Sequence, residues 1–267
     1  MNNPNGSFIW YELATPDPDA AAKFYGRVIG WKIGGPAEPA PEGKDYRMIV
    51  RTDGGFAGGV LKLTPDMAAN GARPTWLGYL QVSDVDAAVK AVLADGGRLL
   101  MPRLDIPVGS FALVMDPLGT PFYVMTPIAP ADKPDMKSDV FDPMATERVR
   151  WNELASPDLA RAKAFYAKHF GFAFNKTMSM GELGDYCFIA HGGIPMIGAI
   201  MQQPLGTPSR GWLFYFGVDS VVAAKAAIEV GGGKVLMGPH EVPGGQWIVV
   251  ADDPQGAGFG VVGPKGA

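Results

Sequence analysis

An internal duplication constrains this 267-residue chain more than any other feature. Trp-Tyr-Glu-Leu-Ala-Thr-Pro-Asp at 10–17 returns as Trp-Asn-Glu-Leu-Ala-Ser-Pro-Asp at 151–158. Further signatures return in the same order: Phe-Tyr at 24–25 and 165–166, Trp-Leu at 76–77 and 212–213, and Asp-Pro-x-Gly at 116–119 and 253–256. Self-similarity at this spacing predicts two copies of one domain rather than a single larger domain.

A fainter repeat divides each copy again. Asp17 and Asp84 each precede an Ala-rich amphipathic run, where an Asp is expected to cap a helix. The runs at 20–28 and 87–94 are followed by glycines, which favour helix ends, and then by short β-type runs. The chain is therefore expected to be α+β, with four strand-helix-three-strand (βαβββ) units at about 7–64, 74–127, 148–203 and 210–263.

The expected domains are 1–128 and 147–267. The segment 129–146 between them contains Pro130, Pro134 and Pro143 among Asp and Lys residues, and it lacks periodicity. Such a composition indicates a Pro-rich linker. A strap packed along the surface is the alternative.

Composition excludes several classes of function. A formal net charge of −4 and a pI near 5.4 disfavour nucleic acid and anionic membranes as partners. The single Cys187 excludes an internal disulfide framework. The start of the chain has no signal-peptide pattern, and no run approaches the ~20 apolar residues of a membrane span. We therefore expect a cytoplasmic protein that is a monomer or a homodimer.

Taken together, the Asp-capped helix ending in Phe-Tyr, the following Gly-Trp or Gly-Phe and the later Asp-Pro-x-Gly resemble the vicinal oxygen chelate superfamily. This superfamily includes glyoxalases, bleomycin resistance proteins and extradiol dioxygenases. The tandem form is similar to bacterial proteins described as glyoxalase-like or hydroxylase-like. The resemblance implies two domains, each a curved mixed sheet cupped around a pocket with helices outside.

The resemblance also implies a divalent metal in the active members, held by His, Glu or Gln at set positions of the cup. Counting from the capping residues and the Asp-Pro-x-Gly turns places Trp10, Leu77 and Tyr123 there in the first copy, and Trp151, Leu213 and Gly260 in the second. None of these is an ordinary metal ligand. We therefore expect no cofactor, with a divalent metal as the main alternative.

Strand periodicity predicts which side chains line each cup. Because side chains alternate between faces, Glu12 should accompany Trp10, and Glu153 should accompany Trp151. The predicted ligand-facing residues are Trp10, Leu77, Tyr79 and Tyr123 in one cup and Trp151, Leu213 and Tyr215 in the other. Glu12 and Glu153 are the candidate catalytic residues, as general bases or ligand anchors. A structural role for the two glutamates, paired with Arg47 or a Tyr hydroxyl, is the alternative. A core role is expected for Trp10, Trp76, Trp151 and Trp212, with a ligand platform as the alternative.

The remaining candidates are weaker. His240 is predicted in a loop that rims the second pocket, His169 near a helix end, His191 before a turn, and Cys187 as a buried thiol. The Pro-rich insertion at 36–44 is either a lid or a surface loop. The glycines at 54–59 lack the strand-turn-helix context of a nucleotide site.

Three alternative functions are consistent with these residues. The first is a metal-free protein that binds a small aromatic or apolar molecule. The second is a lyase, isomerase, hydroxylase or dioxygenase with a nonstandard metal site or with Glu12 and Glu153 as acid–base groups. The third is a structural or interaction protein whose cups are filled by side chains.

Overall fold

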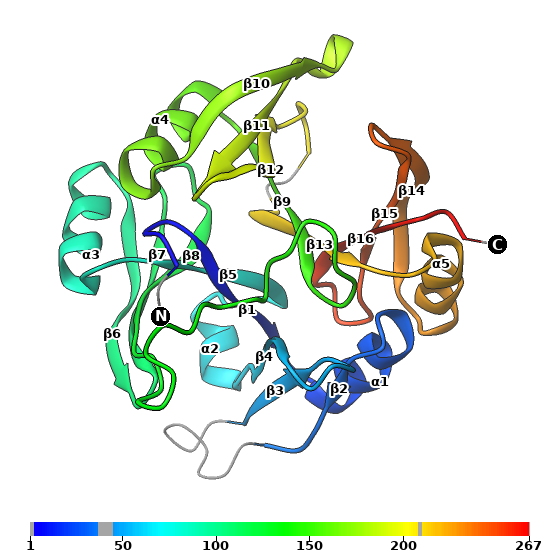
Figure 1. The fold of residues 1–267 in the computed structure, drawn as a ribbon, viewed down its shortest axis with the longest axis horizontal. Coiled ribbons are helices and arrows are strands. Elements are labelled where there is room, and N and C mark those ends of the chain that lie inside the picture. The colour runs from blue at the N-terminus through cyan, green and yellow to red at the C-terminus, as the bar shows by residue number, and fades with distance from the viewer. Residues whose placement is uncertain (1–2, 37–44, 208–209, 267) are drawn as a thin grey trace. The chain divides into compact units, whose positions relative to one another are not determined.

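The computed structural model describes residues 3–36, 45–207 and 210–266. The insertion at 37–44, for which a lid or surface loop was expected, lies outside the described residues. The four βαβββ units predicted from the sequence are confirmed (Figure 1). The first unit consists of β1 (Phe8–Thr15), α1 (Pro18–Val28), β2 (Lys32–Ile33), β3 (Tyr46–Val50) and β4 (Phe56–Lys62).

The other three units repeat this order. After a short helix, α2 (Pro65–Ala69), the second unit runs through β5 (Thr75–Gln81), α3 (Val85–Ala94), β6 (Arg98–Ile106), β7 (Gly109–Met115) and β8 (Pro121–Pro127). The third comprises β9 (Val149–Ser156), α4 (Leu159–Phe170), β10 (Ala173–Ser179), β11 (Asp185–His191) and β12 (Ile194–Gln202). The fourth comprises β13 (Trp212–Gly217), α5 (Val221–Val230), β14 (Lys234–Val242), β15 (Gln246–Asp252) and β16 (Gly258–Gly263).

The strands form two mixed sheets of eight with identical topology. Their orders are β2-β3-β4-β1-β5-β8-β7-β6 and β10-β11-β12-β9-β13-β16-β15-β14. In every unit the first strand pairs in parallel with the last, and the other pairings are antiparallel. This confirms the α+β fold with two curved mixed sheets.

The predicted caps set where the helices begin. Asp17, Asp84 and Asp158 each accept a hydrogen bond from the backbone N–H three residues on, at 2.9–3.0 Å. Ser220 does the same for α5, donated by Ala223 N at 3.1 Å. Each cap pairs one of the helix's first amide groups, which would otherwise lack a partner.

By packing, the chain divides into two compact units that cut across the repeats. Unit 1 contains Met1–Trp10, Leu77–Ser138 and Trp151–Trp212, and unit 2 contains Tyr11–Trp76, Asp139–Arg150 and Leu213–Ala267. Unit 1 therefore holds the second and third βαβββ units, and unit 2 holds most of the first and the fourth. This division differs from the expected domains 1–128 and 147–267. Those domain boundaries remain a prediction.

A buried polar network in unit 1 explains three of the repeated motifs. Tyr166 on α4 donates to Asp116 Oδ2 at 3.0 Å and accepts from Trp212 Nε1 at 3.0 Å. The other oxygen of Asp116 accepts from the amides of Leu118 and Thr120, both at 2.8 Å. One carboxylate oxygen of Asp116 therefore stabilises the Asp-Pro-x-Gly turn, and the other bonds Tyr166 on α4.

Unit 2 contains the equivalent network. Tyr25 on α1 donates to Asp253 Oδ2 at 3.1 Å and accepts from Trp76 Nε1 at 2.9 Å. Burial, followed by the negative charge of the carboxylate, raises the pKa of Tyr25 and of Tyr166 well above their usual range. Trp76 and Trp212 are buried, so of the alternatives for these tryptophans, the core is correct.

The last part of the segment between the repeats contacts residues of unit 2. In unit 2, Asp139 pairs with Arg51 at 2.6 Å and with Arg148 at 3.0 Å. The carboxylate of Glu147 accepts from the amide and hydroxyl of Thr52, both at 2.7 Å. Asp139 and Glu147 therefore contact the first βαβββ unit, while the expected linker bounds 129–146 remain a prediction.

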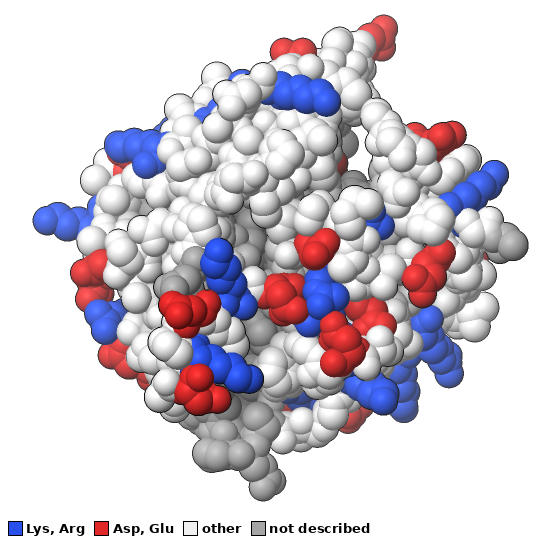
Figure 2. Space-filling view, in the orientation of Figure 1, with Lys and Arg blue, Asp and Glu red and all other residues white. Residues whose placement is uncertain are grey.

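Charged side chains of both signs are interspersed on the face shown in Figure 2. No helix among the described residues is long and apolar enough to cross a membrane.

Candidate binding site

A chain of hydrogen bonds in unit 1 links an indole, a phenol and a carboxylate. Trp151 Nε1 donates to Tyr186 Oη at 2.8 Å, and Tyr186 Oη donates to Glu153 Oε2 at 2.5 Å. Trp151 and Glu153 lie two residues apart on β9, and Tyr186 lies on β11. Trp151 and Glu153 therefore share a face, and a Tyr hydroxyl pairs with Glu153. A ligand-facing role for Glu153 remains a prediction.

These residues occupy the open face of the strands β9–β12. On the opposite face, Leu154, Cys187 and Ile200 are buried, and Lys163 of α4 reaches Cys187 Sγ at 3.5 Å. Trp151, Glu153, Tyr186 and Phe188 are each only partly buried. The alternation places one set of side chains under the helix and the other set on the opposite face, where these four side chains are partly buried and Ala199 is fully buried. We call the second set the open face.

The Tyr186 phenol is a persistent donor. Burial, and then the charge of Glu153, raises the pKa of Tyr186 well above its ordinary value. The phenol therefore stays protonated in neutral solution and donates a hydrogen bond to the carboxylate. A charge-assisted O–H···O⁻ hydrogen bond of this length is among the stronger kinds.

An aromatic wall surrounds the hydrogen-bonded chain. The Phe188 ring lies 6.0 Å from that of Trp151 at 79° and 5.5 Å from that of Tyr186 at 81°. Edge-to-face arrangements of this kind are favourable and fix the rings relative to one another. The open face thus combines apolar rings with one placed carboxylate.

The counterpart of Glu153 in the first repeat, Glu12, is more deeply buried. Glu12 is 2% exposed, and its cross-strand partner is Gly59. A Cβ at Gly59 would collide with the hydroxyl of Tyr46, so the phenol covers this glycine. The alternative in which Arg47 pairs with Glu12 gains no support, because Arg47 pairs with Asp19 at 2.6 Å and Asp45 at 2.9 Å.

Leu77, Tyr79 and Tyr123 come together, as predicted, on one face of β5–β8 in unit 1. The rings of Tyr79 and Tyr123 stack at 4.1 Å and 18°, and the three side chains are at most 7% exposed. Trp10 packs against the same cluster. Their own side chains fill this face.

The corresponding face of β13–β16, in unit 2, carries Tyr215 and Gly260 as partners across the strands. Gly260 replaces Tyr123 of the first repeat, and a Cβ there would overlap the Tyr215 ring. Tyr215 is buried, and Leu213 is partly buried. The glycine allows the ring to lie against the neighbouring backbone.

His240 was expected in a loop before a strand, and this is wrong. It lies inside β14, paired across the strands with Ile248. The Pro239 before it suggested a loop, but β14 is an edge strand, where a proline is tolerated. His169 lies near the C-terminus of α4, and His191 ends β11, as expected.

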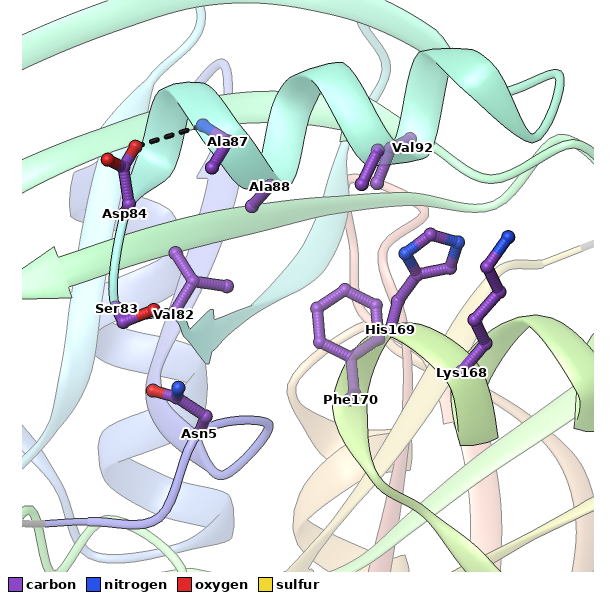
Figure 3. A pocket seen from close by; sticks show the side chains of 11 residues that line it. Asn5, Val82, Ser83, Asp84, Ala87, Ala88, Val92, Lys168, His169 and Phe170 are labelled. Atoms are coloured by element: carbon purple, nitrogen blue, oxygen red, sulfur yellow. Dashed lines mark hydrogen bonds between the residues drawn. The ribbon is translucent and has the colours of Figure 1, made fainter.

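A cavity of about 270 Å³ lies in unit 1 between α3 and α4 (Figure 3). Ala87, Ala88 and Val92 line one side, and His169 and Phe170 line the other. His169 Nε2 lies 2.8 Å from Asp95 Oδ2, which also accepts from Lys168 at 2.7 Å. The charged groups His169 and Lys168 beside this cavity are thus already paired with Asp95.

Comparison with known proteins decides the family. Residues 7–123 and 148–261 match the sequence profile described as "Glyoxalase/Bleomycin resistance protein/Dioxygenase superfamily". The chain belongs to this superfamily. "Putative glyoxylase CFP32" of Mycobacterium tuberculosis is 32% identical over 263 residues, covering 97% of this chain and 95% of that protein. The anthracycline biosynthesis protein DnrV of Streptomyces peucetius is 27% identical over 269 residues, covering 96% and 93%.

Solved structures of the superfamily share the fold. The Mn(II)-bound glyoxalase from Novosphingobium aromaticivorans has a TM-score of 0.63 at 18% identity, covering 98% of this chain and 83% of that chain. The 2,3-dioxygenase LapB from Pseudomonas sp. KL28 has a TM-score of 0.62 at 13% identity, covering 98% and 93%.

The residues present do not fit the metal that the superfamily implies. The positions at which its ligands were expected from the sequence hold Trp10, Leu77, Tyr123, Trp151, Leu213 and Gly260. Across the described ranges, no three side chains of His, Cys, Asp or Glu gather as a metal would require. Such a site needs several nitrogen or oxygen donors around one point.

Sequence reasoning missed Tyr186 and Phe188. Their sequence separation from Glu153 hides the contact, which depends on the register of β11, β12 and β9. A signal was present, since Asp-Tyr at 45–46 returns as Asp-Tyr at 185–186, in the same place in each repeat.

Proposed function

We propose that this protein binds a small planar aromatic molecule on the open face of β9–β12, without a metal. The hydrogen-bonded chain from Trp151 through Tyr186 to Glu153 carries the proposal. It holds a carboxylate in a fixed position beside aromatic rings, and an apolar wall with few placed polar groups is typical of small-molecule sites. A carboxylate accepts several hydrogen bonds, so Glu153 can accept from Tyr186 and from a ligand hydroxyl together.

The relatives support an aromatic ligand. The name of DnrV associates that protein with anthracycline biosynthesis, and anthracyclines are planar aromatic compounds. Location in the cytoplasm and a monomeric or homodimeric state belong to the same proposal.

Titration calorimetry with 2-naphthol, an aromatic ring with one donor, tests the binding site. A hydrogen bond to a charged group contributes about 1.5–3 kcal/mol, so Glu153→Gln should weaken binding roughly tenfold or more. Tyr186→Phe should weaken it less, because it frees the carboxylate to reorient. Glu12→Gln is the matched control in the first repeat and should leave affinity unchanged. Equal affinity in the wild type, Glu153→Gln and Tyr186→Phe would remove this face from the proposal.

Elemental analysis of the purified protein tests the metal-free part. We expect well below one Fe, Mn, Ni or Zn per chain. About one tightly held metal per chain would overturn this part and would point to ligands outside the aligned positions.

Acid–base catalysis is a second candidate, favoured by the position of the Glu153 carboxylate beside the open face. As a general base it could take a proton from a carbon next to a carbonyl of a bound ketone. In D₂O, deuterium would then enter that position, as followed by NMR, and Glu153→Gln would abolish the exchange. Exchange at the uncatalysed rate with the wild type would leave binding as the function.

A further inference from the structure

The cavity between α3 and α4 in unit 1 has a buried apolar interior and a polar edge (Figure 3). Val82, Val92 and Phe170 line the interior and are at most 8% exposed. The exposed polar residues beside the start of α3 are Asn5, Ser83 and Asp84. An apolar cavity of about 150 Å³ is large enough to hold benzene, so a volume of about 270 Å³ has room for one ring with a short polar group.

Small side chains on α3 leave this space open. Ala87, Ala88 and Ala91 line the cavity from this helix. In Figure 3, Ala88 and Val92 lie on the side of α3 that faces the end of α4. Atoms that border a void lack partners for dispersion contacts. An apolar group in the cavity would supply these contacts to the alanines and to Phe170.

The duplication shows what is particular to this cavity. His169 and Val28 of unit 2 follow the repeated Phe-Tyr motif at the same distance. Asp95 and Gly231 of unit 2 likewise follow their helix caps at the same distance. A Cβ at Gly231 would meet the Phe24 ring, so the end of α5 lies against that ring. Unit 1 thus has a polar pair, Asp95 and His169, where unit 2 has apolar packing.

One charge of the cavity is left uncompensated. Asp95 accepts from Lys168 at 2.7 Å and lies 2.8 Å from His169, so the basic side chains are already matched. Asp84 Oδ1 accepts from the amide of Ala87 at 2.9 Å, and among the described residues no basic side chain pairs with Asp84. The positive end of α3 is equivalent to only about half an elementary charge. The cavity is therefore negative beside Asp84, whose second oxygen can accept a further hydrogen bond.

We propose that this cavity binds a small organic cation, an ammonium group attached to a single apolar ring. The ring lies beside Ala88 and Phe170, and the ammonium donates to Asp84 Oδ2. Because α4 covers the face of β9–β12 opposite to Glu153, this site is separate from the open face and does not depend on the proposed function.

Benzylamine and benzyl alcohol are matched probes, because each carries one ring and a donor, but only the amine is charged at neutral pH. Proton–nitrogen correlation NMR on the full chain should show benzylamine shifting amide signals of α3 and the end of α4. It should bind about twofold to fivefold more tightly than benzyl alcohol, the range of an exposed ion pair. This preference should decrease as salt screens the pair. Equal affinity of the two probes, or shifts confined to other elements, would overturn the proposal.

Asp84→Ser removes the charge but keeps the helix cap, because Ser220 caps α5 in the same way, accepting from Ala223 N at 3.1 Å. In this variant the two probes should bind with equal affinity. Asp86→Ser is the matched control, since Asp86 lies in the first turn of α3, pairs with Arg103 and does not line the cavity. It should keep the preference for the amine. An unchanged preference in Asp84→Ser would also overturn the proposal.

Ala88→Leu tests the cavity itself, because the larger side chain fills it. The variant should abolish binding of both probes, whereas Ala94→Leu, at an exposed position of α3 outside the cavity, should bind as the wild type does. Thermal unfolding checks that the variants are folded. Ala91→Val is a smaller change that should weaken benzylamine binding if Ala88→Leu does not fold. Undiminished binding in a folded Ala88→Leu or Ala91→Val protein would place the amine elsewhere and contradict the proposal.

Discussion

At the scale of single residues, the repeated Tyr of Phe-Tyr is a tether. Tyr166 is fully buried, and its hydroxyl both donates to Asp116 and accepts from Trp212. The motifs that reveal the superfamily in the sequence therefore include a structural triad. Recognising the fold from such residues says little about chemistry, because they lie in the core and away from the open face.

Tyr166→Phe should destabilise the protein by about 1–3 kcal/mol, because it leaves a buried indole N–H and a carboxylate oxygen without their partner. Urea unfolding followed by circular dichroism measures the loss. Tyr25→Phe, the counterpart in unit 2, should cost a similar amount. An unchanged unfolding free energy in both would show that these hydroxyls contribute nothing net.

The same tyrosines predict alkaline sensitivity. Their folded pKa values are raised above the unfolded value near 10, so the folded state holds these protons more tightly. The resulting stability is fully present below about pH 10 and is lost as pH rises further. Tyr25→Phe/Tyr166→Phe should therefore lose less stability between pH 9 and 11 than the wild type, measured by urea unfolding. An equal slope would assign the alkaline loss to other groups.

At the scale of elements, periodicity and capping residues predicted the units well. Asp17 and Asp84 begin helices where expected, because a cap is a local interaction. A loop was expected at His240, since Pro239 interrupts the β pattern in the sequence, but β14 continues through both residues. Pairing with the next strand overrides that local signal. The register that joins Tyr186 to Glu153 was likewise invisible to local patterns.

Gly260 allows the Tyr215 ring to lie against its strand partner, and this can be tested directly. Gly260→Ala should cost about 1–3 kcal/mol, as is typical of overpacking. The loss should largely disappear in a Tyr215→Ala background, because the ring that the added methyl group meets is gone. Chemical denaturation of the four proteins in this cycle gives the coupling energy. A coupling near zero would mean that strain elsewhere opposes a side chain at 260.

At the scale of the whole molecule, duplication has been followed by divergence. Both repeats keep the caps, the Asp-Pro-x-Gly turns and the buried Tyr–Asp–Trp contacts that maintain the fold. They differ on the faces opposite the helices. The rings of Tyr79 and Tyr123 stack on the face of β5–β8, whereas the corresponding face of β13–β16 has Gly260 in place of Tyr123. Glu12 is 2% exposed, whereas its counterpart Glu153 is partly buried. Sequence comparison of the repeats predicted the shared core but could not show which face is filled.

This divergence predicts one ligand per chain rather than two. Titration calorimetry with 2-naphthol should give a stoichiometry near one, because Glu153 is partly buried whereas its counterpart Glu12 is 2% exposed. Phe188→Ala should weaken binding by removing the ring that borders Trp151 and Tyr186, whereas Met48→Ala, at the matching position of the first repeat, should bind as the wild type does. A stoichiometry of two, with one site surviving in Phe188→Ala, would show that the first repeat also binds ligand.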